Sequence, residues 1–133
     1  MISIEPICAK HGHNMIQSGE NPKLQDQENV ITKALGVMSE NGLYAMCIFL
    51  LSCNKAVYGK KILTQDIYAL WKELEIIDST VQNNNIEILV ATRQITANLP
   101  KLILTRKVTE QALVFARYHA KAVVPAMREG ERA

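Results

Sequence analysis

The stretch Val37–Asn54, with the sequence VMSENGLYAMCIFLLSCN, decides the fold of this chain. Asn and Gly tolerate the left-handed backbone conformation that closes many helices, so Asn41-Gly42 predicts the end of one helix. The almost wholly apolar run that follows predicts a second, buried helix over Leu43–Ser52. This run is far shorter than the roughly 18 to 20 residues that a membrane span needs. We therefore expect two helices that fold back on each other and are covered by protein.

Length and composition predict one globular domain over residues 1–133. The chain is 48% hydrophobic and 21% charged, which suits a protein with a real core and excludes a disordered chain. Its opening Met1–Glu5 lacks the basic start and cleavage site of a signal peptide, and its three cysteines form no disulfide pattern. A reducing cytoplasm is therefore the expected location.

Helical spacing of apolar residues recurs on both sides of the central stretch, whereas strand-like alternation does not. A first helix is expected within residues 1–20 behind Ser3, although Gly12 weakens it. A better start signal is Asn21-Pro22, with Asn as the N-cap and Pro at the first helical position. The helix that begins there is expected to end at Asn41.

The second half of the chain divides into further segments. In order they are an exposed loop over 54–61, a helix from Thr64 to Ile77, a polar run over 78–85 and an apolar segment over 86–99. A final helix is expected over about 105–124, with a flexible tail over 125–133. The predicted fold is an all-α, compact single-domain bundle of about five to six helices.

The net charge of +2 averages two unlike regions. Up to Thr92 the chain carries seven Lys or Arg against ten Asp or Glu, which gives −3. From Arg93 onward eight basic residues against three acids give +5. The concentration of positive charge in the last third predicts a polyanionic partner, because cations gain by releasing counterions from phosphates. A solvated basic face without a partner is the alternative interpretation.

The two sides of the final helix differ in chemistry when successive residues are turned by about 100°. An apolar side gathers Val108, Ala112, Phe115, Ala116, His119 and Val123. Arg106, Arg117 and Lys121 lie on nearly the opposite side. Glu110 shares this basic side, so part of the charge is neutralised within the helix under the alternative interpretation.

Candidate catalytic and metal-binding residues are few. Cys8, His11 and His13 offer three ligands to a metal but have no clear fourth partner. The two cysteines of the apolar helix are expected to be small buried side chains, and His119 is expected to pack on the apolar side. We predict no catalytic residue, no metal and no cofactor, and therefore a protein that is not an enzyme.

The segment ALGVMSENGLYAMCIFLLSCNK, Ala34–Lys55, resembles the helix, Asn-Gly-Leu turn and buried helix of the small all-helical subunit of type III-B CRISPR effector (Cmr) complexes. The order of elements is similar as well, with a Tyr- and Trp-bearing helix at 62–78 and TEQALVFARYHAKAV at Thr109–Val123. The likeness spans Leu24–Val124, and its specific part is the Asn-Gly-Leu turn with the helix that follows. The first twenty residues depart from the basic, coiled-coil-like opening usual in such subunits.

This resemblance implies a non-catalytic subunit of an RNA-guided antiviral ribonucleoprotein. In that family, copies stack head to tail along the complex and line the groove that holds guide RNA paired with target RNA, while other subunits cleave the target. The implied partners are the backbones of guide and target RNA, other effector subunits and further copies of the chain, with no membrane. Charge placement makes seven residues the candidate RNA-backbone contacts: Lys60, Lys61, Arg93, Arg106, Lys107, Arg117 and Lys121.

Two other classes remain open on sequence grounds. One is a helical protein–protein adaptor, or a subunit of another assembly, whose exposed apolar patches bind a protein and which binds no RNA. A DNA-binding recognition helix would be one version, but Asp66, Glu73 and Glu75 would be repelled by DNA phosphates. The other class is a small enzyme, which a metal requirement or a His or Cys titrating near neutral pH would reveal.

Overall fold

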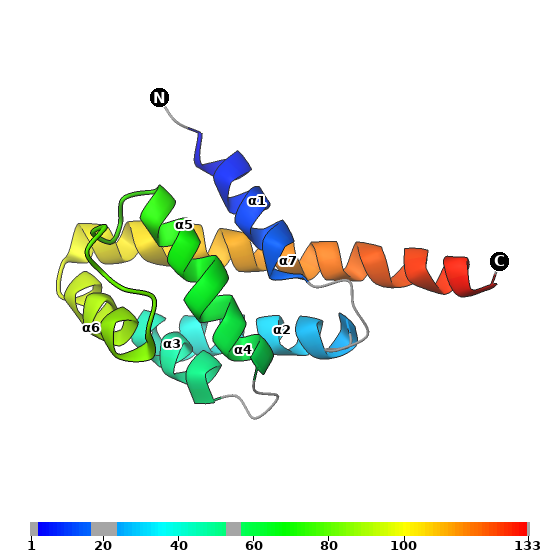
Figure 1. Ribbon diagram of the computed structural model, residues 1–133, viewed down its shortest axis with the longest axis horizontal. Helices are drawn as coiled ribbons and strands as arrows, with labels where there is room; N and C mark the ends of the chain where they lie inside the picture. The colour runs from blue at the N-terminus through cyan, green and yellow to red at the C-terminus, as the bar shows by residue number, and fades with distance from the viewer. Residues whose placement is uncertain (1–2, 17–23, 53–56, 133) are drawn as a thin grey trace.

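The computed structural model describes residues 3–16, 24–52 and 57–132 (Figure 1). Over these residues the chain forms six helices and no strand, which confirms the predicted all-α class. The helices are α1 (Ile4–Met15), α2 (Leu24–Asn41), α3 (Leu43–Ser52), a continuous helix of α4 (Val57–Lys61), π-helical η1 (Ile62–Ile67) and α5 (Tyr68–Glu73), then α6 (Asn85–Thr96) and α7 (Leu99–Arg132).

The long helix α7 is the axis of the molecule, and its C-terminal end extends beyond the other helices (Figure 1). Both α1 and α2 pack along α7, and α3 packs between α2 and α6. The core lies where these helices meet the α4–η1–α5 helix, and it includes the fully buried Trp71, Met46 and Leu50. None of the described helices combines the length and the apolar character needed to cross a bilayer.

The hairpin of α2 and α3 has the boundaries that the sequence predicts. Gly42 adopts a φ of 99°, and its N–H donates to the Met38 carbonyl at 3.0 Å, so it closes α2 as a left-handed cap. Leu43 then begins α3, which buries Leu43, Met46, Cys47 and Leu50. The predicted end of α2 and the predicted buried helix are both confirmed.

The exposed loop predicted over 54–61 is wrong for its described part. Residues 57–61 are helical, and both Tyr58 and Gly59 are buried. Thr64 is not a cap but lies inside the continuous helix, where its hydroxyl donates to the Lys60 carbonyl at 2.8 Å. Burial of Tyr58 against the core outweighs the polar composition of this segment. Residues 53–56, like the predicted start at Asn21-Pro22, lie outside the described residues.

The helix ends also differ from the prediction further along the chain. The helix predicted to reach Ile77 stops at Glu73, the last residue of α5, and Glu75 has a φ of 58°. Ile77 is still buried, but it lies in the irregular segment after the helix. The final helix begins at Leu99 instead of about 105, with Pro100 in the first turn, where its missing N–H needs no partner. The backbone of α7 continues as a helix to Arg132, past the predicted limit at 124 and through the segment predicted as a tail.

Two glycines inside helices, Gly12 in α1 and Gly36 in α2, differ in the space around them. A Cβ at Gly12 would lie 2.6 Å from the Ala112 carbonyl oxygen and 3.0 Å from the Phe115 Cβ, so Gly12 is the contact at which α1 packs on α7. A Cβ at Gly36 would meet nothing within 4 Å. We expect Gly12→Ala to destabilise the protein by about 1–3 kcal/mol and Gly36→Ala to stabilise it by about 0.5–1 kcal/mol.

Urea denaturation followed by circular dichroism measures both changes. Gly36→Ala serves as the matched control, because both variants add one methyl group to a helical glycine and differ only in what that methyl meets. A Gly12→Ala variant as stable as the parent chain would show that α1 does not pack this closely on α7.

Candidate nucleic-acid interface

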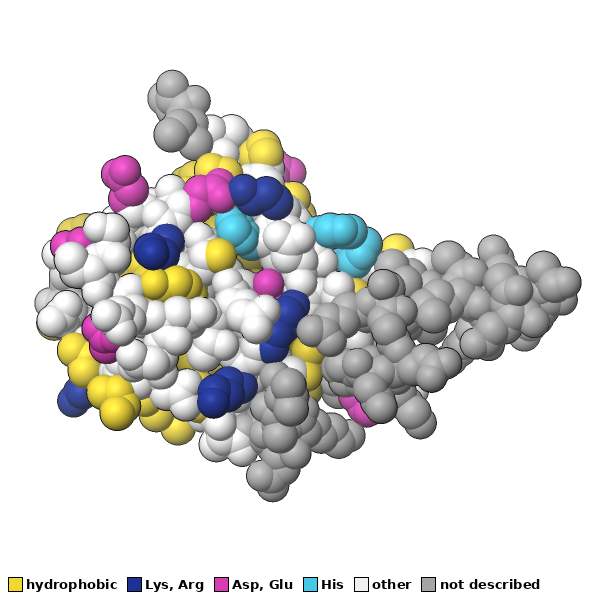
Figure 2. Space-filling model, viewed as in Figure 1, with side chains coloured by type: hydrophobic (Ala, Val, Ile, Leu, Met, Phe, Trp, Pro, Cys, Tyr) yellow, Lys and Arg dark blue, Asp and Glu magenta, His cyan; other side chains and the backbone are white. Residues whose placement is uncertain are grey.

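The seven candidate RNA contacts do not share one environment. Lys60, Arg93, Lys107 and Lys121 are exposed, whereas Lys61, Arg106 and Arg117 are partly buried. In the view of Figure 2, Lys and Arg side chains are spread over the face and interspersed with acidic and uncharged ones, rather than gathered in a single patch.

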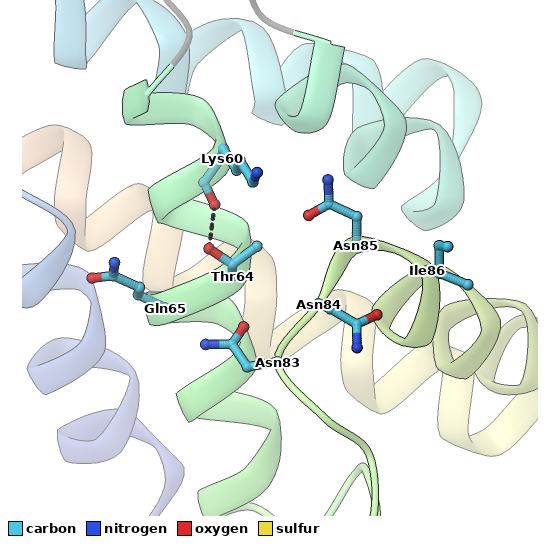
Figure 3. A pocket seen from close by; sticks show the side chains of 7 residues that line it. All are labelled: Lys60, Thr64, Gln65, Asn83, Asn84, Asn85 and Ile86. Carbon is cyan, nitrogen blue, oxygen red and sulfur yellow. Dashed lines mark hydrogen bonds between the residues drawn. The ribbon is translucent and has the colours of Figure 1, made fainter.

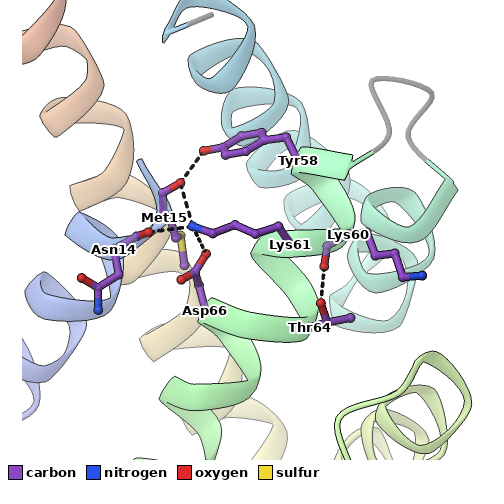
Figure 4. A network of polar contacts seen from close by, with 7 residues as sticks. All are labelled: Asn14, Met15, Tyr58, Lys60, Lys61, Thr64 and Asp66. Atoms are coloured by element: carbon purple, nitrogen blue, oxygen red, sulfur yellow. Dashed lines mark hydrogen bonds and ion pairs between the residues drawn. The ribbon is translucent and has the colours of Figure 1, made fainter. Parts of the chain in front are cut away.

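Lys61 points into the protein and joins the α4–η1–α5 helix to the end of α1 (Figure 4). Its Nζ forms an ion pair with Asp66 Oδ2 at 2.9 Å and donates to the Asn14 carbonyl at 2.7 Å. The Met15 carbonyl accepts from Lys61 Nζ at 3.4 Å and from the Tyr58 hydroxyl at 2.9 Å. These donors satisfy the last carbonyls of α1, which have no partner within their own helix.

The Lys61 side chain is only 12% exposed, and that of Asp66 is 8% exposed. Burial raises the pKa of the Asp66 carboxyl, and the hydrogen bond and charge of Lys61 act against this rise. The ammonium of Lys61 is thus engaged by a buried carboxylate and two carbonyls. The contact of Lys61 with RNA stays a prediction from charge placement alone.

The basic side of α7 lies along α2 instead of facing open solvent. Arg106 Nη2 donates to the Met38 carbonyl at 3.0 Å and to the Ser39 carbonyl at 3.2 Å, at the C-terminal end of α2. A cation at this position also interacts favourably with the negative end of the helix dipole. Near the other end of α2, Lys121 Nζ lies 3.8 Å from Glu28 Oε1. The predicted basic stripe is therefore partly an interhelical contact.

Between α2 and α7 lies a pocket of about 370 Å³, which we call the arginine pocket. Its walls include Arg106, Glu110 and Arg117 from α7, and Gly36 and Ser39 from α2. The Nε of Arg117 is buried and has no hydrogen-bond partner among the described residues. A buried N–H without an acceptor costs free energy, and here that cost falls on a residue of the pocket wall.

A second hollow lies between the α4–η1 part of the continuous helix and the start of α6, and we call it the amide groove (Figure 3). It has a volume of about 630 Å³ and is lined by Lys60, Thr64, Gln65 and residues 83–86. Among the seven candidate contacts, only Lys60 lines this groove. Arg93 is exposed on α6 and Lys107 is exposed on α7, in neither of these two hollows.

The cysteine and histidines of α1 do not converge on one point. The Cys8 thiol donates to a backbone carbonyl of α7 at 3.5 Å, and His11 Nε2 lies 3.1 Å from Glu73 Oε1. The His13 ring contacts His119 edge to face, with centroids 4.4 Å apart. Desolvation, and secondly the charge of His13, lower the pKa of His119. Within the described ranges no three His, Cys, Asp or Glu side chains are grouped as a metal would require.

Cys47 is enclosed in α3, as the apolar run around it predicts. Burial raises the pKa of its thiol to about 12, against a smaller lowering by the Thr92 hydroxyl 3.8 Å away. The thiol is therefore protonated at neutral pH and is not activated as a nucleophile.

Two features of these hollows were missed by sequence reasoning. The run 83–85 is interpreted from the sequence only as part of a polar break between helices, although its three asparagine side chains supply six N–H donors and three oxygen acceptors. The second missed feature is Gly36. A glycine inside a helix costs about 1 kcal/mol of stability relative to alanine, so its presence there is a signal of a packing or binding role.

Comparisons with known proteins do not identify a relative: no protein-family model, no curated protein and no solved structure matches this chain.

Proposed function

We propose that the protein is a non-catalytic helical subunit of a type III-B RNA-guided effector complex, where it holds the phosphate backbone of guide or target RNA. Other subunits and further copies of the chain, stacked head to tail, are its proposed protein partners. Cleavage of the target belongs to other subunits. The proposal rests on the resemblance of Ala34–Lys55 and on the chemistry of the arginine pocket.

The arginine pocket is the observation that carries RNA binding. It brings Arg106 and Arg117, which are eleven residues apart in α7, to the walls of one hollow. Both guanidinium side chains are partly buried, and phosphate oxygens are the acceptors that guanidinium groups bind best. The Glu110 carboxylate in the same wall repels anions. This repulsion favours a ligand with one or two phosphates in the pocket over a more densely charged ligand.

The region of resemblance forms the part of the fold that borders this pocket. The last turns of α2 supply Gly36, Met38 and Ser39 to its wall. Gly42 closes α2 immediately before α3 begins at Leu43, so the Asn-Gly-Leu turn fixes where the α2 carbonyls meet Arg106. The stretch that resembles the Cmr subunit therefore accepts the hydrogen bonds of Arg106 and borders the proposed RNA site.

Two substitutions in the pocket test this function by fluorescence anisotropy with labelled single-stranded RNA over a range of salt concentrations. Arg117→Gln removes one cation, so we expect weaker binding and a salt slope reduced by about one. Gly36→Leu fills the open space at the pocket without a clash at its Cβ, so we expect it to weaken binding while the fold stays intact. Thermal unfolding of each variant checks the fold.

Lys33→Gln is the matched control, because Lys33 is exposed on α2 outside the pocket and its replacement removes the same charge. If Arg117→Gln and Lys33→Gln weaken RNA binding equally, the net charge of the protein and not the arginine pocket determines the affinity. Absence of RNA binding at low salt would contradict the proposed function. Recovery of short guide RNAs and several subunits with the tagged chain from its native host would support it.

A helical adaptor that binds protein and no RNA is the second candidate. It is favoured by exposed apolar side chains on neighbouring turns, Ile86 with Val90 on α6 and Leu99 with Ile103 on α7. Co-purification separates the two candidates, since an adaptor would recover a protein partner without RNA.

A further inference from the structure

The amide groove has a composition that suits hydrogen-bonded recognition. Its volume of about 630 Å³ lies within the range of small-molecule sites. Lys60, Thr64 and Gln65 form one wall and the three asparagines form the other, so its lining holds one cation and no carboxylate. In Figure 3 the side chains of Lys60 and Asn85 extend toward each other from opposite walls.

Most of these amides are free to bind a ligand. Asn84 is engaged as the cap of α6, since its Oδ1 accepts from the Glu87 N–H at 2.9 Å and its Nδ2 donates to Glu87 Oε2 at 2.8 Å. Asn83, Asn85 and Gln65 have no side-chain hydrogen bond to any described residue. Each carboxamide carries both a donor and an acceptor side by side.

This pattern fits a nucleotide better than a bare anion. Paired donors and acceptors match the edges of unstacked bases and the 2′-hydroxyl of ribose. Lys60 supplies the charge for one phosphate, and Ile86, whose surface is 76% exposed, gives an apolar contact for a base or sugar face. A bare anion would leave the amide oxygens without donors.

We propose that the amide groove binds one nucleotide of single-stranded RNA, with Asn83 and Asn85 contacting the base or ribose and Lys60 contacting the phosphate. This inference rests on the proposed function, and it adds base or sugar recognition to the proposed backbone contacts. No aromatic side chain lines the groove, so recognition is by hydrogen bonds at the edges of the base and not by stacking.

The test measures anisotropy of labelled oligo-A, oligo-C and oligo-U RNA, and of the matching DNA, with the full chain. For Asn83→Ala/Asn85→Ala we expect about tenfold weaker RNA binding and smaller differences among the three RNAs, with an unchanged salt slope. For Lys60→Gln we expect the salt slope to fall by about one while base preference stays. Gln94→Ala is the matched control, since Gln94 is an exposed amide of α6 outside the groove.

The outcomes separate this inference from the proposed function. RNA binding that the asparagine variant leaves unchanged would overturn the groove assignment and leave the function standing. No RNA binding by the parent chain would overturn both. If the Asn83→Ala/Asn85→Ala variant loses a protein subunit from the purified complex but retains RNA, the inference would be overturned and the groove would bind a protein.

Discussion

Lys61→Met is expected to lower the free energy of unfolding by about 3–5 kcal/mol, the range for breaking a buried ion pair by removing one partner. The methionine keeps most of the side-chain volume but leaves the Asp66 carboxylate, 8% exposed, without its counter-ion. It also leaves the Asn14 carbonyl, and in part the Met15 carbonyl, without a donor. Urea denaturation followed by circular dichroism measures the loss.

The same variant is expected to show a characteristic dependence on pH. Burial raises the pKa of Asp66 and Lys61 opposes that rise, so removal of Lys61 raises this pKa further. When the pKa is higher in the folded than in the unfolded protein, the unfolded chain releases its proton first as pH rises. Stability is therefore lost as pH rises between the two values, and Lys61→Met is expected to lose less stability near pH 4 than at pH 7.

Lys60→Met is the control, because Lys60 is the preceding residue on the same helix and its side chain is exposed. We expect Lys60→Met to change stability by less than about 0.5 kcal/mol. The double variant Lys61→Met/Asp66→Leu is expected to recover much of the loss, since no buried charge remains. A loss in Lys61→Met that is the same at both pH values would contradict this account.

The α2–α3 hairpin was predictable because its determinants are local. Gly42 marks the left-handed residue, and the apolar run after it has no polar side that favours exposure. The helical state of 57–61 was not predictable in this way. Its stabilising contacts, from Tyr58 and Lys61 to the end of α1, join residues more than forty positions apart. The local signals of Gly59 and two lysines favour a loop, and tertiary contacts override them.

The candidate interface shows the same limit. The periodicity of α7 correctly places Arg106 and Arg117 away from the buried Val108 and Ala112. It does not reveal that α2 covers this side, because the pattern of one helix specifies its own faces and not the neighbour that packs on them. The amide groove could not be predicted from local sequence either, because its walls come from α4 and η1 on one side and from the start of α6 on the other.

Trp71→Ala is expected to destabilise the protein by about 3–5 kcal/mol, the range for truncating a buried tryptophan. Trp71 is fully buried in the core, and its indole Nε1 donates to the Thr109 hydroxyl at 2.9 Å. The alanine variant therefore creates a cavity between α5 and α7 and also leaves the buried Thr109 without this donor. Guanidinium denaturation followed by circular dichroism measures the combined effect.

A double-mutant cycle separates the hydrogen bond from the packing. Trp71→Phe removes the donor but keeps an aromatic ring, and Thr109→Val removes the acceptor at nearly constant size, so each is expected to cost about 1–3 kcal/mol by leaving one buried group unpaired. The double variant leaves neither group, so it is expected to cost less than the sum of the two. Because Trp71 is the only tryptophan, its fluorescence in Thr109→Val reports directly on the indole environment. Strict additivity of the two single changes would show that the bond contributes nothing, and that packing alone holds α5 against α7.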